Sequence, residues 1–264
     1  MALDNNRIKD RRTSLSNIKQ NANFFWKPVP GKQVVRIVPY KFCPDFPFIE
    51  LKFHYGLAGK NYISPDSFNR PDPIVEFSNQ LKKNGIKDDW KSGKALEPKM
   101  RTYVPVIVRG KESEGVKFWS FGKQVYQELL SIIDDPEYGD ITDLTKGRDI
   151  TVEFKDVVET GKSFPETSIR IKPNPTPAVD PTNKELVQLL GKQTDLVTLF
   201  EEKSYDELAT ILEQHLNPQS ETVESSTNSE PSVEDEPALK SVSGTKAPTS
   251  DADTMAAFKN LFGE

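Results

Sequence analysis

The chain is poor in the residues that build most cross-linked and catalytic sites. Its 264 residues include two histidines and a single cysteine, Cys43. One cysteine excludes an intrachain disulfide and fits a reducing compartment. No run approaches the roughly 18 apolar residues of a membrane span, and the N-terminus lacks the apolar segment of a signal peptide. These absences predict a protein that is soluble and cytoplasmic.

Motifs of phosphate-cradling or metal-dependent catalysis are missing as well. The sequence has no loop of the G-x-x-x-x-G-K-[ST] type. Its acidic pairs, such as Asp88-Asp89 and Asp134-Asp135, are adjacent, and adjacent residues do not converge on one substrate. The sequence neither excludes nor suggests the convergent carboxylates of a metal nuclease. We therefore expect a protein without enzymatic activity.

The charge of the chain is distributed unevenly. The formal net charge is −5, and residues 217–264 alone carry nine acidic residues against three lysines, a net of −6. Residues 1–216 therefore carry +1 in total. Residues 82–123 hold eleven lysines and arginines against five acidic residues. Five aromatic residues lie among these charges: Trp90, Tyr103, Phe118, Trp119 and Phe121.

Cations interleaved with aromatic rings suit a single-stranded nucleic acid. Phosphates need cations, unstacked bases need aromatic faces, and an acidic tail can occupy the same groove as a mimic of the polyanion. Lysine-rich stretches are also common on solvated faces. For residues 82–123 both interpretations stay open on the sequence alone.

Composition divides the chain into three parts. Residues 1–22 form a polar arm with five lysines and arginines against two aspartates. Residues 23–216 hold enough aromatic and branched apolar residues for one core domain of about 200 residues. Residues 217–264 are rich in Ser, Thr, Glu and Pro. Burial cannot offset chain entropy in such a segment, so we expect the tail to be disordered.

Local patterns predict short strands and a few helices. Period-two alternation and β-branched runs predict strands over 33–39, 49–55, 103–108, 116–121, 149–155 and 167–172. Capping signals and helical spacing predict helices over 72–83, 123–133, 182–191 and 204–216. This mixture favours an α+β fold built on a Greek-key barrel of the oligonucleotide-binding (OB) type, with helical insertions. Periodicity alone does not separate such a barrel from other α+β folds.

Several segments, taken in order, resemble one protein family. They are Arg11-Arg12-Thr13-Ser14-Leu15, Phe25-Trp26-Lys27 with Gly31 to Ile37, His54 with Gly59-Lys60-Asn61-Tyr62-Ile63, Phe118-Trp119-Ser120-Phe121-Gly122-Lys123 and Ser204-Tyr205-Asp206-Glu207-Leu208. Followed by an acidic tail, they resemble the single-stranded DNA-binding (helix-destabilising) protein of T-even-type bacteriophages. The resemblance covers most of the chain, and the segment from Phe118 is its most specific part.

The resemblance implies a function and a set of partners. Such a protein binds single-stranded DNA cooperatively and without sequence preference, and protects and organises it during phage DNA replication, recombination and repair. It would work in the cytoplasm of the infected bacterial host, with no membrane contact. The motif Arg11, Arg12, Thr13, Ser14 and Leu15 would mediate cooperative self-association, and the acidic tail would bind phage replication and recombination proteins. The alternative is a replication scaffold whose tail recruits enzymes and whose core binds nucleic acid only weakly.

Charge and aromaticity nominate the residues that would contact DNA. The cations expected to meet phosphates are Lys99, Arg101, Arg109, Lys117 and Lys123, and the rings expected to stack on bases are Tyr62, Tyr103, Trp119 and Phe164. Phe118, Phe121 and Tyr126 are expected in the core, with Trp119 on the opposite face of its strand from Phe118. Trp26 and Trp90 are expected to be packing residues.

The sequence departs from the family at one point. Better-known members hold zinc with one histidine and three cysteines, and His54 falls at the histidine position. The segment from Ser64 to Val75 contains no cysteine, and structural zinc needs four ligands. We therefore predict no zinc and no other cofactor, with His54 an ordinary histidine. The counterpart of the zinc subdomain, about 55–83, would be held by Ile63, Phe68, Ile74, Val75, Phe77 and Leu81.

Overall fold

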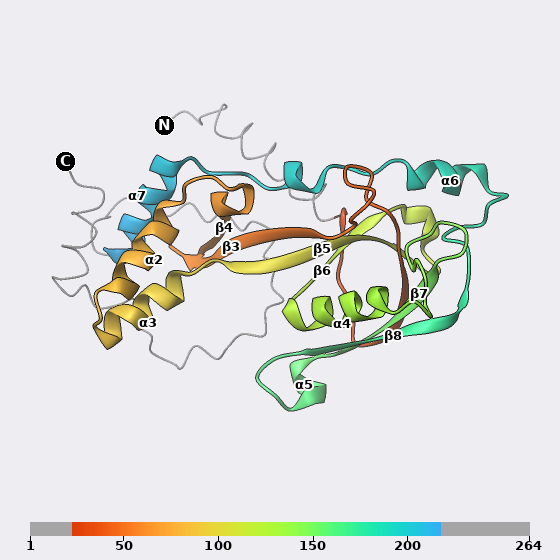
Figure 1. Ribbon diagram of the computed structural model, residues 1–264, viewed down its shortest axis with the longest axis horizontal. Coiled ribbons are helices and arrows are strands. Elements are labelled where there is room, and N and C mark those ends of the chain that lie inside the picture. The colour runs from red at the N-terminus through yellow and green to blue at the C-terminus, as the bar shows by residue number, and fades with distance from the viewer. Residues whose placement is uncertain (1–22, 218–264) are drawn as a thin grey trace, which may run out of the picture. The chain divides into compact units, whose positions relative to one another are not determined.

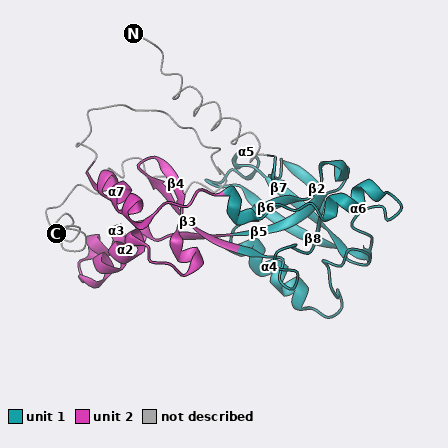
Figure 2. Ribbon diagram, turned by 90° about the horizontal axis from the view of Figure 1, so that it is seen from above, with its two compact units in different colours: residues 1–49, 102–199, 229–238 teal, residues 50–101, 200–228, 239–264 magenta. Residues whose placement is uncertain are grey.

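The structure is a computed structural model that describes residues 23–217 (Figure 1). The basic arm, with its predicted cooperativity motif at 11–15, lies outside the described residues, as does the acidic tail from residue 218. Two compact units make up the described chain (Figure 2). Unit 1 contains residues 23–49 and 102–199, and unit 2 contains residues 50–101 and 200–217.

Eight described strands form one sheet. They are β1 (Phe25–Trp26), β2 (Gly31–Ile37), β3 (Ile49–Leu57), β4 (Lys60–Ile63), β5 (Lys99–Val108), β6 (Lys117–Phe121), β7 (Arg148–Lys155) and β8 (Glu166–Pro175). The order along the sheet is β1-β6-β5-β2-β7-β8, and β3 pairs with β4 and β5. The two-residue β1 runs parallel to β6, whereas β2 is antiparallel to both β5 and β7.

The predicted α+β class is confirmed, but a closed barrel is not. The pairings of the described strands follow an open path from β1 to β8, so they do not close the sheet. The sequence of β8 fits an end of the path, because Pro173 and Pro175 lack the N–H groups that a further strand would need as donors.

Six α-helices are described in residues 23–217: α2 (Pro73–Lys83), α3 (Lys87–Leu96), α4 (Lys123–Asp134), α5 (Val157–Thr160), α6 (Lys184–Leu190) and α7 (Tyr205–Leu216). Short 3-10 turns lie at Pro65–Phe68, Glu112–Glu114 and Leu196–Leu199. The predicted caps are confirmed. Asp72 accepts from the amides of Ile74 and Val75, and Ser204 forms a capping box with Glu207. In residues 23–217 none of the helices has the length and apolar character that crossing a membrane requires.

Each unit has its own apolar core. In unit 1, α4 packs Val125 and Leu129 against strand residues such as Val35, Val106 and Ile150. In unit 2, the residues that join α2, α3 and α7 are Leu57, Ile74, Phe77, Leu81, Leu96, Leu208, Leu212 and Leu216. Of the predicted contacts around α2, Ile63, Ile74, Phe77 and Leu81 are buried.

Candidate nucleic-acid interface

Two of the four rings expected to stack on bases are buried in unit 1. Tyr103 on β5 and Trp119 on β6 are each 1% exposed. Trp119 packs edge-to-face against Trp26 and Phe121, with ring centroids 5.7 and 4.7 Å apart. A ring without an accessible face cannot stack on a base. The prediction of a DNA-facing ring is therefore wrong for Tyr103 and Trp119.

The error comes from the assumption that β6 has one solvated face. Phe118 and Trp119 do point to opposite sides, as consecutive strand residues must. However, Phe118 contacts the buried Tyr40, while Trp119 joins the main core of unit 1. β6 lies between β1 and β5 in the sheet, and both its faces are covered. The expected burial of Phe118, Phe121 and Tyr126 is confirmed.

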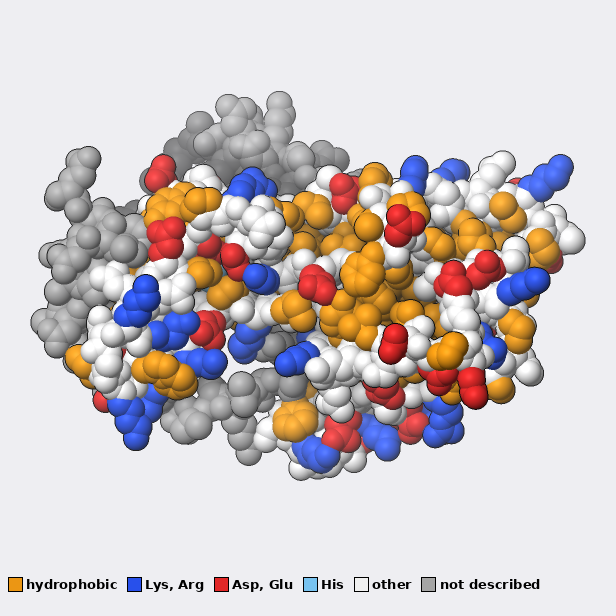
Figure 3. Space-filling view, viewed as in Figure 1, with side chains coloured by type: hydrophobic (Ala, Val, Ile, Leu, Met, Phe, Trp, Pro, Cys, Tyr) orange, Lys and Arg blue, Asp and Glu red, His pale blue; other side chains and the backbone are white. Residues whose placement is uncertain are grey.

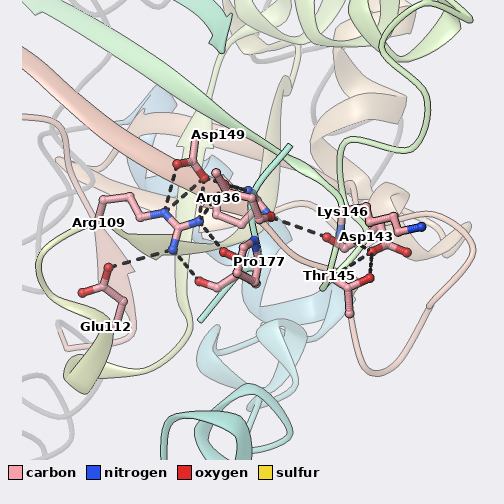
Figure 4. A network of polar contacts seen from close by, with 10 residues as sticks. Arg36, Arg109, Glu112, Asp143, Thr145, Lys146, Asp149 and Pro177 are labelled. Atoms are coloured by element: carbon pink, nitrogen blue, oxygen red, sulfur yellow. Dashed lines mark hydrogen bonds and ion pairs between the residues drawn. The ribbon is translucent and has the colours of Figure 1, made fainter. Parts of the chain in front are cut away.

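Arg109, expected to meet a phosphate, lies instead in a polar network of unit 1 (Figure 4). Its Nη2 is 2.7 Å from Asp149 Oδ1, and its Nη1 donates to the Ala178 carbonyl at 2.7 Å. The buried Arg36 pairs with the same carboxylate at 2.9 Å and donates to the Thr176 carbonyl. We call these groups the Arg36 network. Through these bonds the Arg109 guanidinium holds residues 176–178 against β2, β5 and β7. Its donors are already used inside the fold, which contradicts a role as an open phosphate contact.

Arg101 and Lys117 are also poorly placed to meet a phosphate. Arg101 is buried. The Lys117 side chain is 16% exposed, and its ammonium lies 2.6 Å from the Glu114 carboxylate. That hydrogen bond lowers the pKa of Glu114, so the partner carboxylate stays charged. Neither cation has the exposure that the prediction required.

Lys99 and Lys123 do have that exposure. Lys99 begins β5 in unit 2, and its Nζ lies 5.8 Å from the centre of the Tyr55 ring. Lys123 is the first residue of α4 in unit 1. The first turn of this helix holds no acidic residue, so the lysine adds its charge to the positive end of the helix dipole.

The remaining predicted rings are accessible to different degrees. Phe164 lies in the connection between α5 and β8 and is 41% exposed. Val158 in α5 itself is almost fully exposed, so this end of unit 1 presents apolar side chains to solvent. Tyr62 on β4 is half-buried, because one side of it packs against the core of unit 2.

A comparison with protein families adds a decisive observation. A family model described as gp32 DNA binding protein like matches residues 30–217. The chain belongs to this gp32-like family. The resemblance inferred from the order of the sequence motifs is thereby confirmed. A comparison with curated proteins finds no match.

The residues around His54 do not fit the zinc ion of better-known gp32-like proteins. His54 Nδ1 lies 3.1 Å from the Leu96 carbonyl oxygen, and Nε2 lies 2.9 Å from Asp72 Oδ2. A zinc ligand needs a nitrogen with a free lone pair, whereas here both nitrogens are held in hydrogen bonds. Among residues 23–217, no three or more His, Cys, Asp and Glu side chains are grouped as a metal ion would require.

The bonds around Asp72 define the protonation of this group, which we call the His54 cluster. Burial alone would raise the pKa of the Asp72 carboxyl, but hydrogen bonds from His54, Ser64 and the Val75 amide outweigh it and lower that pKa. An ionised carboxylate only accepts, and so does a carbonyl. Both nitrogens of the buried His54 ring therefore face acceptors, and Nε2 is paired with Asp72.

Sequence reasoning missed an exposed aromatic residue in unit 2 of this gp32-like chain. Trp90 on α3 was expected to be a packing residue but is 49% exposed, with Lys94 Nζ 5.8 Å from its ring. Lys83 and Lys87 are exposed nearby in the chain, and Figure 3 shows Lys and Arg side chains gathered over α2 and α3. The available signal was the spacing of Trp90 and Lys94, because residues four apart lie on the same face of a helix.

A second omission lies between β2 and β3 in unit 1. Phe42 and Phe46 are 52% and 44% exposed. The segment Lys41-Phe42-Cys43-Pro44-Asp45-Phe46-Pro47 places aromatic residues between prolines. Prolines prevent a regular strand or helix that would bury all the rings on one side, and this composition was the signal that sequence reasoning passed over.

Proposed function

We propose that this protein binds single-stranded DNA cooperatively and without sequence preference. It would protect and organise that DNA during phage DNA replication, recombination and repair in the bacterial cytoplasm. The observation that carries the proposal is membership of a DNA-binding family over residues 30–217. Exposed rings with cations beside them, above all Trp90 with Lys94, support it. Binding and release, rather than catalysis, would be its whole activity.

The mechanism follows from what duplex DNA hides. A base contributes roughly 1–3 kcal/mol when it stacks on an aromatic ring, and any base can do so. Base faces are accessible only in single strands, so binding shifts the melting equilibrium toward separated strands. Exposed lysines such as Lys99, Lys123 and those of α3 would contact phosphates in any sequence.

Three finer features belong to the same proposal. The sheet would be an open variant of the OB barrel, with β2, β5 and β7 as its centre. The arm with Arg11 and Arg12 would mediate contacts between neighbouring copies on a strand. The acidic tail would compete with DNA for cations and recruit replication and recombination proteins.

We also propose that the protein works without zinc. The His54 cluster joins β3, α2 and the end of α3 with hydrogen bonds, and α2, α3 and α7 share an apolar core. Purified protein should then contain far less than one zinc per chain, and a chelator should leave its melting temperature unchanged. One zinc per chain would overturn this part of the proposal.

Fluorescence of tryptophan on addition of oligo(dT) tests the central function. Trp119 is buried and Trp26 half-buried, so most of the quenching should come from Trp90. We expect strong quenching that added salt reverses, and a much smaller signal from a Trp90→Phe variant that still binds. Absence of quenching, together with no binding by fluorescence anisotropy, would favour the scaffold alternative.

The predicted role of the arm has its own test. Arg11→Ala combined with Arg12→Ala should weaken binding to long strands far more than binding to an oligonucleotide that covers one site. Equal weakening on both would make the arm a further phosphate contact instead of a contact between copies.

A further inference from the structure

The connection between β2 and β3 in unit 1 displays two rings that the predicted interface does not use. This aromatic loop, residues 40–48, contains Tyr40, Phe42, Phe46 and Phe48. Tyr40 and Phe48 are buried, whereas Phe42 and Phe46 keep about half of their surface in water. An exposed phenylalanine forgoes the stability that burial would bring. The exposed half of each ring therefore adds nothing to the stability of the fold.

Each exposed ring is supported by a buried one. The Phe42 and Tyr40 ring centroids are 5.4 Å apart with an angle of 52° between the planes. Those of Phe46 and Phe48 are 5.5 Å apart with an angle of 66°. Tilted and edge-to-face contacts fix a ring in place while part of its face remains accessible, as a stacking platform requires.

Hydrogen bonds anchor the start of the loop, and two backbone bonds within it run from the Cys43 amide to the Tyr40 carbonyl and from the Phe46 amide to the Cys43 carbonyl. The Tyr40 hydroxyl donates to Asp195 Oδ1 at 2.9 Å and accepts from the Leu196 amide at 3.0 Å. Burial raises the pKa of Tyr40 to about 12, so this donor persists at neutral pH. The Gln193 side chain accepts from the Lys41 amide at 3.0 Å. A loop that is ordered in advance loses little conformational freedom when a ligand arrives.

The charges near the loop suit a ligand with bases and phosphates. Lys41 Nζ lies 5.9 Å from the centre of the neighbouring Phe42 ring. Phe48 contacts Tyr126 at 5.2 Å, and Tyr126 lies in the first turn of α4, which begins at the exposed Lys123. Asp45 in the loop is also exposed and offsets part of this charge. Ring stacking, more than charge, would thus carry the contact.

We propose that Phe42 and Phe46 form a base-stacking site for single-stranded DNA, an inference that rests on the proposed function. An unpaired nucleobase offers a flat face to each ring and a phosphate to the adjacent lysine. In duplex DNA both faces of each base are covered by stacking, so the site takes unpaired bases only.

Affinity measurements on the full chain test the site. Phe42→Leu combined with Phe46→Leu should weaken binding to a short labelled oligo(dT) about tenfold or more, by fluorescence anisotropy at fixed salt. The slope of log K against log salt should stay unchanged, because no cation is removed. The matched control is Leu144→Ala combined with Val187→Ala, which alters two other exposed apolar residues of unit 1 and should bind normally.

The native cysteine allows a second, positional test. Cys43 is the one cysteine of the chain, it is exposed, and it lies between the two phenylalanines in sequence. An oligo(dT) with a disulfide-tethered base should cross-link to it by thiol–disulfide exchange, releasing the small thiol. Unmodified oligo(dT) should suppress the product, duplex DNA should not, and Cys43→Ser should give none. A cross-link that excess oligo(dT) leaves unchanged would contradict the site.

The outcomes separate this site from the proposed function. Normal oligo(dT) affinity of the double Leu variant would overturn the site alone, whereas a wild-type chain that does not bind would overturn the function itself. Weakening on long strands only would assign the loop to contacts between copies and overturn stacking. If the Leu variant unfolds, Phe42→Tyr with Phe46→Tyr keeps the rings, and weak binding by this folded variant would also overturn the proposal.

Discussion

The two units bury charge in opposite ways. In unit 1 the Arg36 network places two guanidinium groups against the single buried carboxylate of Asp149. In unit 2 the His54 cluster pairs one imidazole ring with one carboxylate, that of Asp72, which also accepts from Ser64 and two backbone amides. Both groups tie distant segments of sequence together, but a guanidinium is always charged, whereas an imidazole ring can be neutral.

This difference determines how each unit responds when its anion is lost. A guanidinium remains charged at any pH that a folded protein meets, even though burial lowers the pKa of Arg36. An imidazole can release a proton and become neutral. We therefore infer that Asp149 is indispensable to unit 1, whereas unit 2 can relax around a missing Asp72 charge.

The largest expected effect comes from Asp149→Ala. The change leaves two guanidinium groups of unit 1 without their carboxylate, and breaking a buried ion pair on one side costs about 3–5 kcal/mol. Urea denaturation should show this loss, and the exposed Asp134→Ala should change stability by about 0.5 kcal/mol or less. Adding Arg36→Met to Asp149→Ala should restore part of the stability. If stability is not restored, the unpaired guanidinium charge is not the cause of the loss.

Asp72→Asn should have a smaller effect on unit 2. The Asn oxygen can still accept from the amides at the start of α2, and an imidazole ring can act as acceptor toward the new amide N–H. We expect a loss of about 1–3 kcal/mol in urea denaturation, the range for a buried polar group left unsatisfied. Asp66→Asn, which affects a half-exposed pair with Lys52, is the control. A loss as large as that of Asp149→Ala would break the comparison between the units.

Acid should distinguish the wild type from Asp72→Asn. The pKa of Asp72 is lowered in the folded state, so its stabilising contribution is complete above the unfolded value of about 3.9. It is lost as the pH falls below that value and through the lower folded pKa. The free energy of unfolding of the wild type should therefore fall more steeply below about pH 4 than that of the Asn variant. Parallel curves would show that Asp72 carries no such contribution.

The helices that the sequence predicts best are those with local signals. The caps of Asp72 and Ser204 and the apolar stripe of α4 mark α2, α7 and α4. α3 was not predicted, because its sequence Lys-Asp-Asp-Trp-Lys-Ser-Gly-Lys-Ala-Leu is mostly polar. The stability of α3 comes from close packing against α2. A Cβ atom at Gly93 would lie 2.7 Å from the Ser78 carbonyl oxygen, so only glycine allows the two helices to come this close. Such tertiary contacts leave no periodicity to detect.

The candidate interface was predicted by residue type but not by exposure. Cations and rings of residues 82–123 were expected on the surface, yet Arg101, Tyr103 and Trp119 are buried. In a strand such as β6, consecutive aromatic residues point to opposite faces. The sequence does not show whether one of these faces is open to solvent or whether both are covered. For Trp90 and Phe42 the sequence offers Lys94 and the flanking prolines as signals, but the degree of exposure depends on which neighbours the fold supplies.

The smallest effect separates cations used inside the fold from cations left for DNA. Lys123→Gln should lower the slope of log K against log salt by about 0.7, the contribution of one phosphate contact on a single strand. Arg109→Lys keeps the charge but loses the paired hydrogen bonds to Asp149, so it should reduce stability while leaving the slope unchanged. Salt titrations of oligo(dT) binding measure the slope, and urea denaturation of each variant measures its stability. If Arg109→Lys changes the slope while its stability stays normal, the Arg36 network is open to DNA, and unit 1 uses the same cations for folding and for binding.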